Sequence, residues 1–260
     1  MANRPDLKTL VSRDGETIAY RMREGKTSAK AARAGSPGFL SLTGLKSDMD
    51  GLKAIETDRF AKARGLGAVR FDYYGHGASS GTFEEGSISR WLDNALQVFD
   101  EVTKGPQILV GSSMGGWLAL LVALARSERV KGLVLIAPAP DFTEVMKAGL
   151  PDEARALHDA GKPWPRPSAY DDEPYLITRD LLEDGKKHLL LQAPIALRQP
   201  VRILHGLKDD EVAPQRSLTL VDRLAGDDVS LTFLKDGDHR LSDKAGLKAL
   251  DEALASILAC

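Results

Sequence analysis

Short apolar runs alternate with longer segments of helical spacing along this 260-residue chain. The runs at 39–43, 68–72 and 107–111 have the length and composition of buried strands. The segments 52–64 and 88–102 repeat their apolar residues at the spacing of amphipathic helices. Strands that alternate with helices form a mainly parallel sheet with helices on both faces. The sequence therefore predicts an α/β fold.

Four further apolar runs, at 17–22, 132–137, 200–205 and 229–234, continue the pattern, and a final helix is expected at 243–258. The strand count is thus large enough for one wide sheet. We find no internal repeat and no long low-complexity tract that would indicate a solenoid or a disordered region.

The segment 141–199 interrupts this alternation. It carries six prolines and Trp164, and its ends lack the composition of a linker. We interpret it as an insertion that folds over the sheet rather than as a second domain. The predicted organisation is a single domain, 1–260, with a core at 1–140 and 200–260 and a cap at 141–199.

Charge and cysteine content exclude several classes of protein. The chain has 35 Lys and Arg against 37 Asp and Glu, so no basic field favours nucleic acid as a partner. Cys260 is the single cysteine, which excludes an internal disulfide and fits a reducing compartment. The chain lacks an apolar signal peptide and any uninterrupted apolar run of ~18 residues, so no membrane span is expected. We expect a cytoplasmic protein. The basic segment 23–37 is interpreted as a solvated hairpin loop, with a functional basic arm as the alternative.

The sequence Gly-Ser-Ser-Met-Gly at 111–115 lies between a buried strand and an apolar helix. This is the G-x-S-x-G pattern, whose sharp turn projects the middle serine above a sheet. The pattern identifies Ser113, not Ser112, as a candidate nucleophile. A glycine-rich turn whose serines only cap the helix is the structural alternative.

A serine hydroxyl needs an adjacent base, and on this strand–turn–helix the partners follow in the order acid, then histidine. His239 follows the last strand, at the carboxyl edge of the sheet where sites form, and is the candidate base. His158 and His188 lie in the cap and are expected at the surface. His205 directly precedes Gly206, and we expect it to be partly buried with its hydrogen bonds made.

Three carboxylates follow the strand at 200–205. Asp209 is the candidate acid, because the turn after the strand brings it back towards the loop of His239. Asp210 and Glu211 are expected to face water or to cap the helix that follows Pro214. Asp238 is adjacent to His239 in sequence, which does not place it at the ring.

Two backbone N–H groups, those of Leu45 and Met114, are the candidates for an oxyanion hole. Leu45 lies in the loop after the strand at 39–43, and Met114 follows the nucleophile at the start of a helix. For the cap we predict an acyl pocket, with a plain cap core as the alternative. Its candidate lining residues are Phe142, Met146, Trp164 and Tyr170.

The chain resembles the α/β-hydrolase superfamily over nearly its whole length. The resemblance is carried by 70–73, 105–117, 205–210 and 238–240 in the core, and by 167–170 and 188–190 in the cap. Within the superfamily it is similar to the mitochondrial palmitoyl-protein thioesterases, also described as acyl-glucuronide esterases. The resemblance implies the α/β-hydrolase fold and assigns Ser113, Asp209 and His239 as the triad.

Two departures from the family limit what carries over. Thr43 stands where many oxyanion loops have histidine before the glycine, so no side-chain role of that histidine is expected. The chain begins close to the domain without an evident transit peptide, so the expected location stays cytoplasmic.

The predicted activity is hydrolysis of a small-molecule acyl ester or thioester, or of an S-acylated protein, through an acyl-enzyme on Ser113. This chemistry requires no cofactor and no metal, and none is predicted. Other chemistry on the same fold (a C–C bond hydrolase or a peptidase) and a non-catalytic binding module remain alternatives. The sequence leaves the oligomeric state open.

Overall fold

The computed structural model describes residues 5–25, 36–168 and 173–260. Its centre is an eight-stranded sheet in the order β1-β2-β4-β3-β5-β6-β9-β10. Strand β2 is antiparallel to both of its neighbours, and the six strands β4, β3, β5, β6, β9 and β10 are parallel to one another. The strands are β1 (Leu7–Val11), β2 (Thr17–Arg23), β3 (Gly38–Leu42), β4 (Ala68–Phe71), β5 (Gln107–Ser112), β6 (Val130–Ile136), β9 (Val201–Gly206) and β10 (Val229–Leu234).

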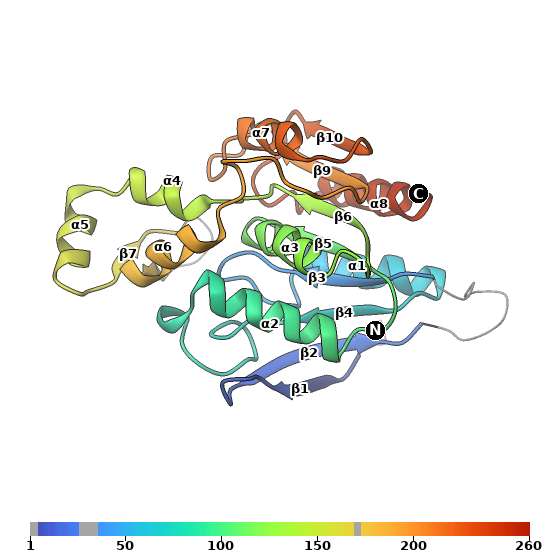
Figure 1. Ribbon diagram of the computed structural model, residues 1–260, viewed down its shortest axis with the longest axis horizontal. Coiled ribbons are helices and arrows are strands. Elements are labelled where there is room, and N and C mark those ends of the chain that lie inside the picture. The colour runs from blue at the N-terminus through green and yellow to red at the C-terminus, as the bar shows by residue number, and fades with distance from the viewer. Residues whose placement is uncertain (1–4, 26–35, 169–172) are drawn as a thin grey trace.

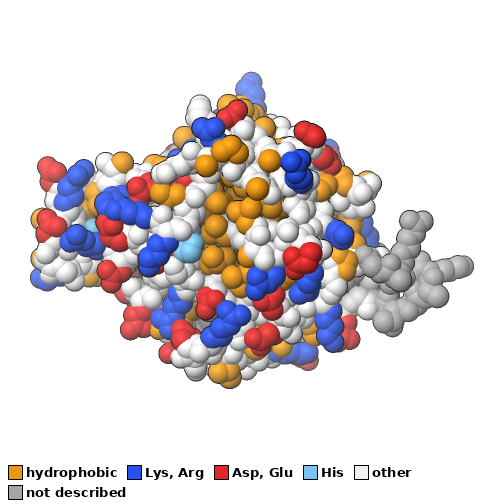
Figure 2. Space-filling view, viewed as in Figure 1, with side chains coloured by type: hydrophobic (Ala, Val, Ile, Leu, Met, Phe, Trp, Pro, Cys, Tyr) orange, Lys and Arg blue, Asp and Glu red, His pale blue; other side chains and the backbone are white. Residues whose placement is uncertain are grey.

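Helices cover both faces of this sheet (Figure 1). One face carries α1 (Leu52–Arg64) and α8 (Lys244–Leu258), which contact each other. The other carries α2 (Ile88–Glu101), α3 (Met114–Ala125) and α7 (Gln215–Arg223). Because helices pack on both sides, the central strands are buried on both faces, as in β4, all four residues of which are buried. Figure 2 shows apolar side chains gathered over α3, between α2 and α7.

The predicted α/β-hydrolase fold is confirmed, and so is each strand and helix expected in the core. One element differs from the expectation. Strand β1 was not expected, because four of its five residues are exposed and an edge strand of this kind has no apolar alternation.

The segment between β6 and β9 lies beyond the carboxyl ends of the parallel strands (Figure 1). It contains α4 (Phe142–Ala148), α5 (Asp152–Asp159), β7 (Trp164–Arg166), β8 (Tyr175–Ile177) and α6 (Arg179–Gly185), and then a short 3₁₀ helix at Lys186–His188. Strands β7 and β8 form an antiparallel pair separate from the main sheet. We keep the name cap for residues 141–199.

Two predictions from the sequence, the basic hairpin loop and the fourth pocket residue, concern residues that the structure does not describe. Residues 26–35 of the basic segment are not among the described residues, and neither is Tyr170. Within the described ranges, no helix combines the length and the apolar composition needed to cross a lipid bilayer.

Candidate active site

Ser113 lies at the turn between β5 and α3, with φ 54° and ψ −120°. A side chain at this φ is strained, and the strain is of order 1–3 kcal/mol. Close packing around the turn requires glycine on both sides. A Cβ on Gly111 would lie 2.4 Å from the carbonyl oxygen of Gly115, and a Cβ on Gly115 would lie 2.1 Å from that of Leu42. The motif therefore has its predicted structural context.

Hydrogen bonds join Ser113, His239 and Asp209. The Ser113 Oγ lies 3.1 Å from His239 Nε2, and His239 Nδ1 lies 2.8 Å from Asp209 Oδ2. The three residues follow β5, β10 and β9, whose carboxyl ends meet at one edge of the sheet. Residues that are 126 positions apart in the chain are thus brought into contact by the parallel topology.

The Asp209 carboxylate is surrounded by hydrogen-bond donors. Its Oδ1 accepts the N–H groups of Glu211 (3.0 Å) and Val212 (2.8 Å), and its Oδ2 accepts His239 and also His205 Nε2 (3.0 Å). Burial alone would raise the pKa of this carboxyl. The hydrogen bonds from His205 and His239 outweigh it, and the pKa of Asp209 lies well below its ordinary value. Asp209 is therefore an anion at neutral pH.

His205 is fully buried, rather than partly buried as expected, and its polar atoms are satisfied. The Ser217 hydroxyl donates to its Nδ1 (2.6 Å), so Nε2 carries the proton that is shared between Asp209 and the Val212 carbonyl oxygen. It supports the carboxylate and does not contact Ser113.

The two remaining carboxylates of this loop, Asp210 and Glu211, are both exposed, which is one of the two alternatives expected for them. The other alternative does not occur, because no side chain among the described residues caps α7. The Glu211 carboxylate also pairs with Arg166 of β7 at 2.7 Å. This ion pair with the cap segment was not expected, because sequence order does not reveal that Arg166 lies within reach.

The loop after β3 lies directly against the serine. A Cβ on Gly44 would come within 3.3 Å of the Ser113 Cβ, which places Leu45 beside the nucleophile. Met114 is the first residue of α3, where an N–H has no acceptor within the helix. Both predicted oxyanion donors, Leu45 and Met114, line the same cavity as Ser113 and His239.

This cavity has a volume of about 700 Å³ and lies between the core and the cap. Three of the predicted pocket residues, Phe142, Met146 and Trp164, line it. Tyr170, the fourth, lies outside the described residues. The cap thus contributes apolar side chains to the space in front of Ser113. A volume of this size is typical of sites for small organic ligands.

One histidine near the site, His76, was not predicted from the sequence, because the candidate base was expected after Ser113. His76 lies before the nucleophile in the chain, in the glycine-rich loop that follows β4, and is 4% exposed. Its Nε2 contacts the backbone N–H of Lys46, next to Leu45. The signal that could have found it is the Gly-His-Gly sequence at 75–77, directly after a strand end.

Comparison with known proteins identifies relatives over most of the chain. Mouse and human "Palmitoyl-protein thioesterase ABHD10, mitochondrial" are 40% and 37% identical over 90% and 95% of this chain and 76% of each relative. The structure of mouse alpha/beta hydrolase domain-containing protein 10 superposes with a TM-score of 0.87, at 37% identity, over 98% of both chains. A crystal structure from Agrobacterium vitis S4 gives a TM-score of 0.91 at 40% identity, over 97% of this chain and 98% of the other.

These relatives overturn the expected location. The mammalian relatives are named as mitochondrial proteins, so the expectation of a cytoplasmic protein is wrong. A single cysteine, one feature behind that expectation, does not distinguish the cytoplasm from another reducing compartment.

The family is established by a further match. Residues 47–252 match the family model described as "Alpha/beta hydrolase family". The matched range includes Ser113, Asp209 and His239. Family, relatives and topology agree that the protein is a hydrolase enzyme. The chain belongs to the α/β hydrolase family.

Proposed function

We propose that this hydrolase is a serine enzyme that cleaves ester or thioester bonds of acyl substrates through an acyl-enzyme on Ser113. The observation that carries the proposal is the unbroken chain of hydrogen bonds from Ser113 through His239 to Asp209. A base within hydrogen-bond reach of a serine, and itself oriented by a carboxylate, is the arrangement that activates a hydroxyl.

Each group has a defined role in the proposed mechanism. His239 Nε2 removes the proton of Ser113 while Oγ attacks the carbonyl carbon of the substrate. The N–H groups of Leu45 and Met114 donate to the resulting oxyanion. Protonated His239 then gives its proton to the departing alcohol or thiol. Water, deprotonated by the same imidazole, cleaves the acyl-enzyme and releases the acid.

Asp209 has two functions in this sequence of steps. It accepts the Nδ1–H of His239, which leaves Nε2 unprotonated and facing the serine. It also stabilises the imidazolium that forms when the serine proton is transferred. Because hydrogen bonds hold its pKa low, it remains charged throughout.

For the substrate we propose an acyl thioester or ester, a small molecule or an S-acylated protein. The relatives' name, palmitoyl-protein thioesterase, supports the thioester. The apolar cap residues Phe142, Met146 and Trp164 support an acyl chain in the cavity. Val145 of α4, 52% exposed, also lines the cavity and is available to a longer chain.

A fluorophosphonate probe tests the nucleophile. We expect labelling of the wild-type protein at Ser113 and none in Ser113→Ala. Ser112→Ala is the matched control, because Ser112 is the adjacent serine and is outside the proposed hydrogen-bond chain. Labelling of folded Ser113→Ala, or its absence from wild type, would contradict the proposed nucleophile.

Steady-state kinetics on paired p-nitrophenyl esters and acyl thioesters of graded chain length test the substrate. Hydrolysis that rises with chain length supports an acyl pocket under the cap. Turnover that Ser113→Ala retains would refute the acyl-enzyme.

A further inference from the structure

The loop that carries the proposed oxyanion donor contains a strained turn. The N–H of Ser47 donates to the carbonyl oxygen of Gly44 at 3.1 Å, which closes a four-residue turn, Gly44 to Ser47. Lys46, the third residue of this turn, has φ 58°. A positive φ at that position favours glycine or asparagine, and a lysine there is held only if its surroundings determine it.

His76 is the group that contacts this strained position. Its Nε2 lies 3.1 Å from the backbone nitrogen of Lys46. Its Nδ1 lies 3.0 Å from the carbonyl oxygen of Tyr74. A carbonyl oxygen only accepts, so Nδ1 carries the ring proton and Nε2 is left as the acceptor for the Lys46 N–H. Burial lowers the pKa of His76 to about 4, and the ring therefore remains neutral in this tautomer.

Three aromatic side chains pack against the imidazole ring of His76. Tyr73, Phe83 and Trp91 surround it edge-to-face, with centroids 5.7, 5.6 and 5.2 Å from the imidazole. The carbonyl oxygen of Tyr74 is fixed too, because it also accepts Trp91 Nε1 at 3.0 Å. The imidazole therefore cannot follow the turn if the turn moves.

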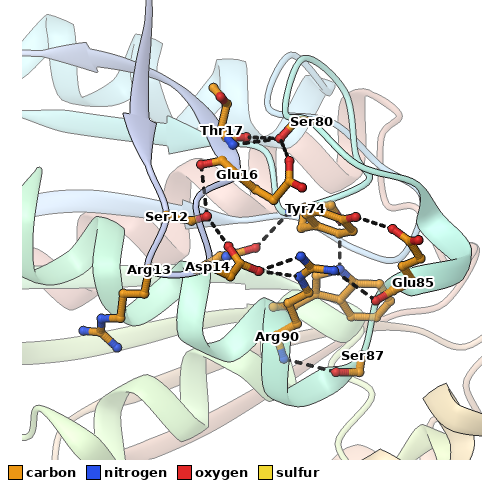
Figure 3. Close-up of polar contacts among 12 residues, drawn as sticks. Ser12, Arg13, Asp14, Glu16, Thr17, Tyr74, Ser80, Glu85, Ser87 and Arg90 are labelled. Atoms are coloured by element: carbon orange, nitrogen blue, oxygen red, sulfur yellow. Dashed lines mark hydrogen bonds and ion pairs between the residues drawn. The ribbon is translucent and has the colours of Figure 1, made fainter.

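The backbone that carries His76 is anchored by the polar network drawn in Figure 3. There the Arg90 guanidinium lies 3.2 Å from the centre of the Tyr74 ring and is paired with Asp14 of the β1–β2 hairpin. The Tyr74 hydroxyl donates to Glu85. The network thus ties the residue two positions before His76 to the turn between β1 and β2 and to α2.

We propose that His76 is a positioning residue for the oxyanion hole: by accepting the N–H of Lys46 it holds the Gly44–Ser47 turn so that the N–H of Leu45 points at the reacting carbonyl. The proposal rests on the proposed function of Ser113. The same loop is also held at Met49, whose N–H donates to the Asp72 carboxylate at 2.6 Å and whose carbonyl oxygen accepts Arg70 at 2.7 Å. Met49 lies three residues beyond the turn position that His76 contacts.

The test uses three variants. His76→Phe keeps a flat ring among the aromatic neighbours and removes the acceptor. His76→Gln offers an amide oxygen near the position of Nε2 and is the conservative rescue. His158→Phe is the matched control. His158 was expected at the surface, but it is buried in α5 of the cap and bonded to the carbonyl oxygen of Ile177.

For His76→Phe we expect kcat on a p-nitrophenyl ester to fall about 10–100-fold with KM changed by less than about threefold. Affinity for a trifluoromethyl ketone, whose tetrahedral adduct carries an oxyanion, should fall by a similar factor. His76→Gln should recover most of both losses. His158→Phe should leave both unchanged even if its melting temperature falls.

A loss of kcat in His158→Phe equal to that in His76→Phe would show that destabilisation alone is responsible and would overturn the proposal. So would unchanged trifluoromethyl ketone affinity in His76→Phe. If that variant does not fold, long-range ¹H–¹⁵N NMR spectra of wild type decide, since a proton on Nε2 of His76 refutes the acceptor role. This readout does not depend on turnover, whereas the proposed function fails if wild-type Ser113 is not acylated.

Discussion

Replacing Asp209 by asparagine tests the proposed mechanism at the residue with the most completely defined surroundings. All four groups around the carboxylate are donors: the imidazoles of His205 and His239 at Oδ2 and two backbone N–H groups at Oδ1. An amide has one oxygen and one NH₂. One pair of donors must therefore face a donor, whichever way the amide is oriented.

The two orientations differ in cost. With NH₂ at the Oδ1 position, the N–H groups of Glu211 and Val212 lose their acceptor, and two unsatisfied donors cost roughly 2–6 kcal/mol. With NH₂ at the Oδ2 position, His239 can change tautomer and His205 can keep its Nε2 proton on the Val212 carbonyl oxygen, so only one donor loses an acceptor and this orientation is cheaper. It places a proton on His239 Nε2, where the ring can no longer accept from Ser113.

We therefore expect Asp209→Asn to remain folded and to lose about 10⁴-fold in kcat on a p-nitrophenyl ester, the size of effect that an inverted tautomer produces in serine proteases. Asp210→Asn is the matched control, because Asp210 is the exposed neighbour, and its kcat should stay within about twofold of wild type. Circular dichroism and urea unfolding check the fold. A kcat for Asp209→Asn within about tenfold of wild type would refute the reasoning.

Three further predictions follow from the same geometry. Gly115→Ala should lose about 3 kcal/mol or more of unfolding free energy in urea, because the new Cβ lies 2.1 Å from the Leu42 carbonyl oxygen, whereas Gly149→Ala, with 3.5 Å to its nearest atom, should change by less than about 1 kcal/mol. Ser113→Gly should be inactive towards esters yet more stable by about 1 kcal/mol in the same assay, since glycine relieves the strain at φ 54°; a less stable variant would contradict this. Burial lowers the pKa of His76 from 6.5 to about 4, so as pH falls the unfolded chain binds the proton first and the free energy of unfolding decreases between pH 6.5 and 4. In urea titrations across that range, His76→Phe should lack this part of the decrease.

The sequence predicted the core of the fold because its signals are local. A five- or six-residue apolar run such as that of β5 has the same appearance whatever its neighbours, and G-x-S-x-G has meaning once a strand precedes it and a helix follows. Ser113 and His239 could therefore be singled out from pattern and chain order alone. Asp209 needed a geometric step, the direction of the turn after β9, which chose it from three consecutive carboxylates.

The cap could not be predicted in the same way. Its helices α4, α5 and α6 have seven or eight residues each, about two turns, which is too short for an apolar period to stand out. The ion pair between Arg166 and Glu211 depends on how β7 lies over the loop after β9, and no local pattern contains that information. His76 was missed for a related reason, since its contact with Lys46 joins two loops thirty positions apart.

Asp209 contributes both to stability and to the proposed catalysis, whereas the Ser113 side chain contributes only to the proposed catalysis. Ser113 is partly exposed and strained, so its geometry is imposed by the packing of Gly111 and Gly115 and is not itself stabilising. Asp209 is buried and holds four donors, so the group that orients His239 also closes the loop after β9. Ser113→Ala, which keeps a side chain at the strained φ, therefore reports on chemistry alone, whereas Ser113→Gly also relieves the strain. A variant at Asp209 reports on chemistry only after its loss of unfolding free energy has been measured, because the loop that aims the carboxylate at His239 is built around that carboxylate.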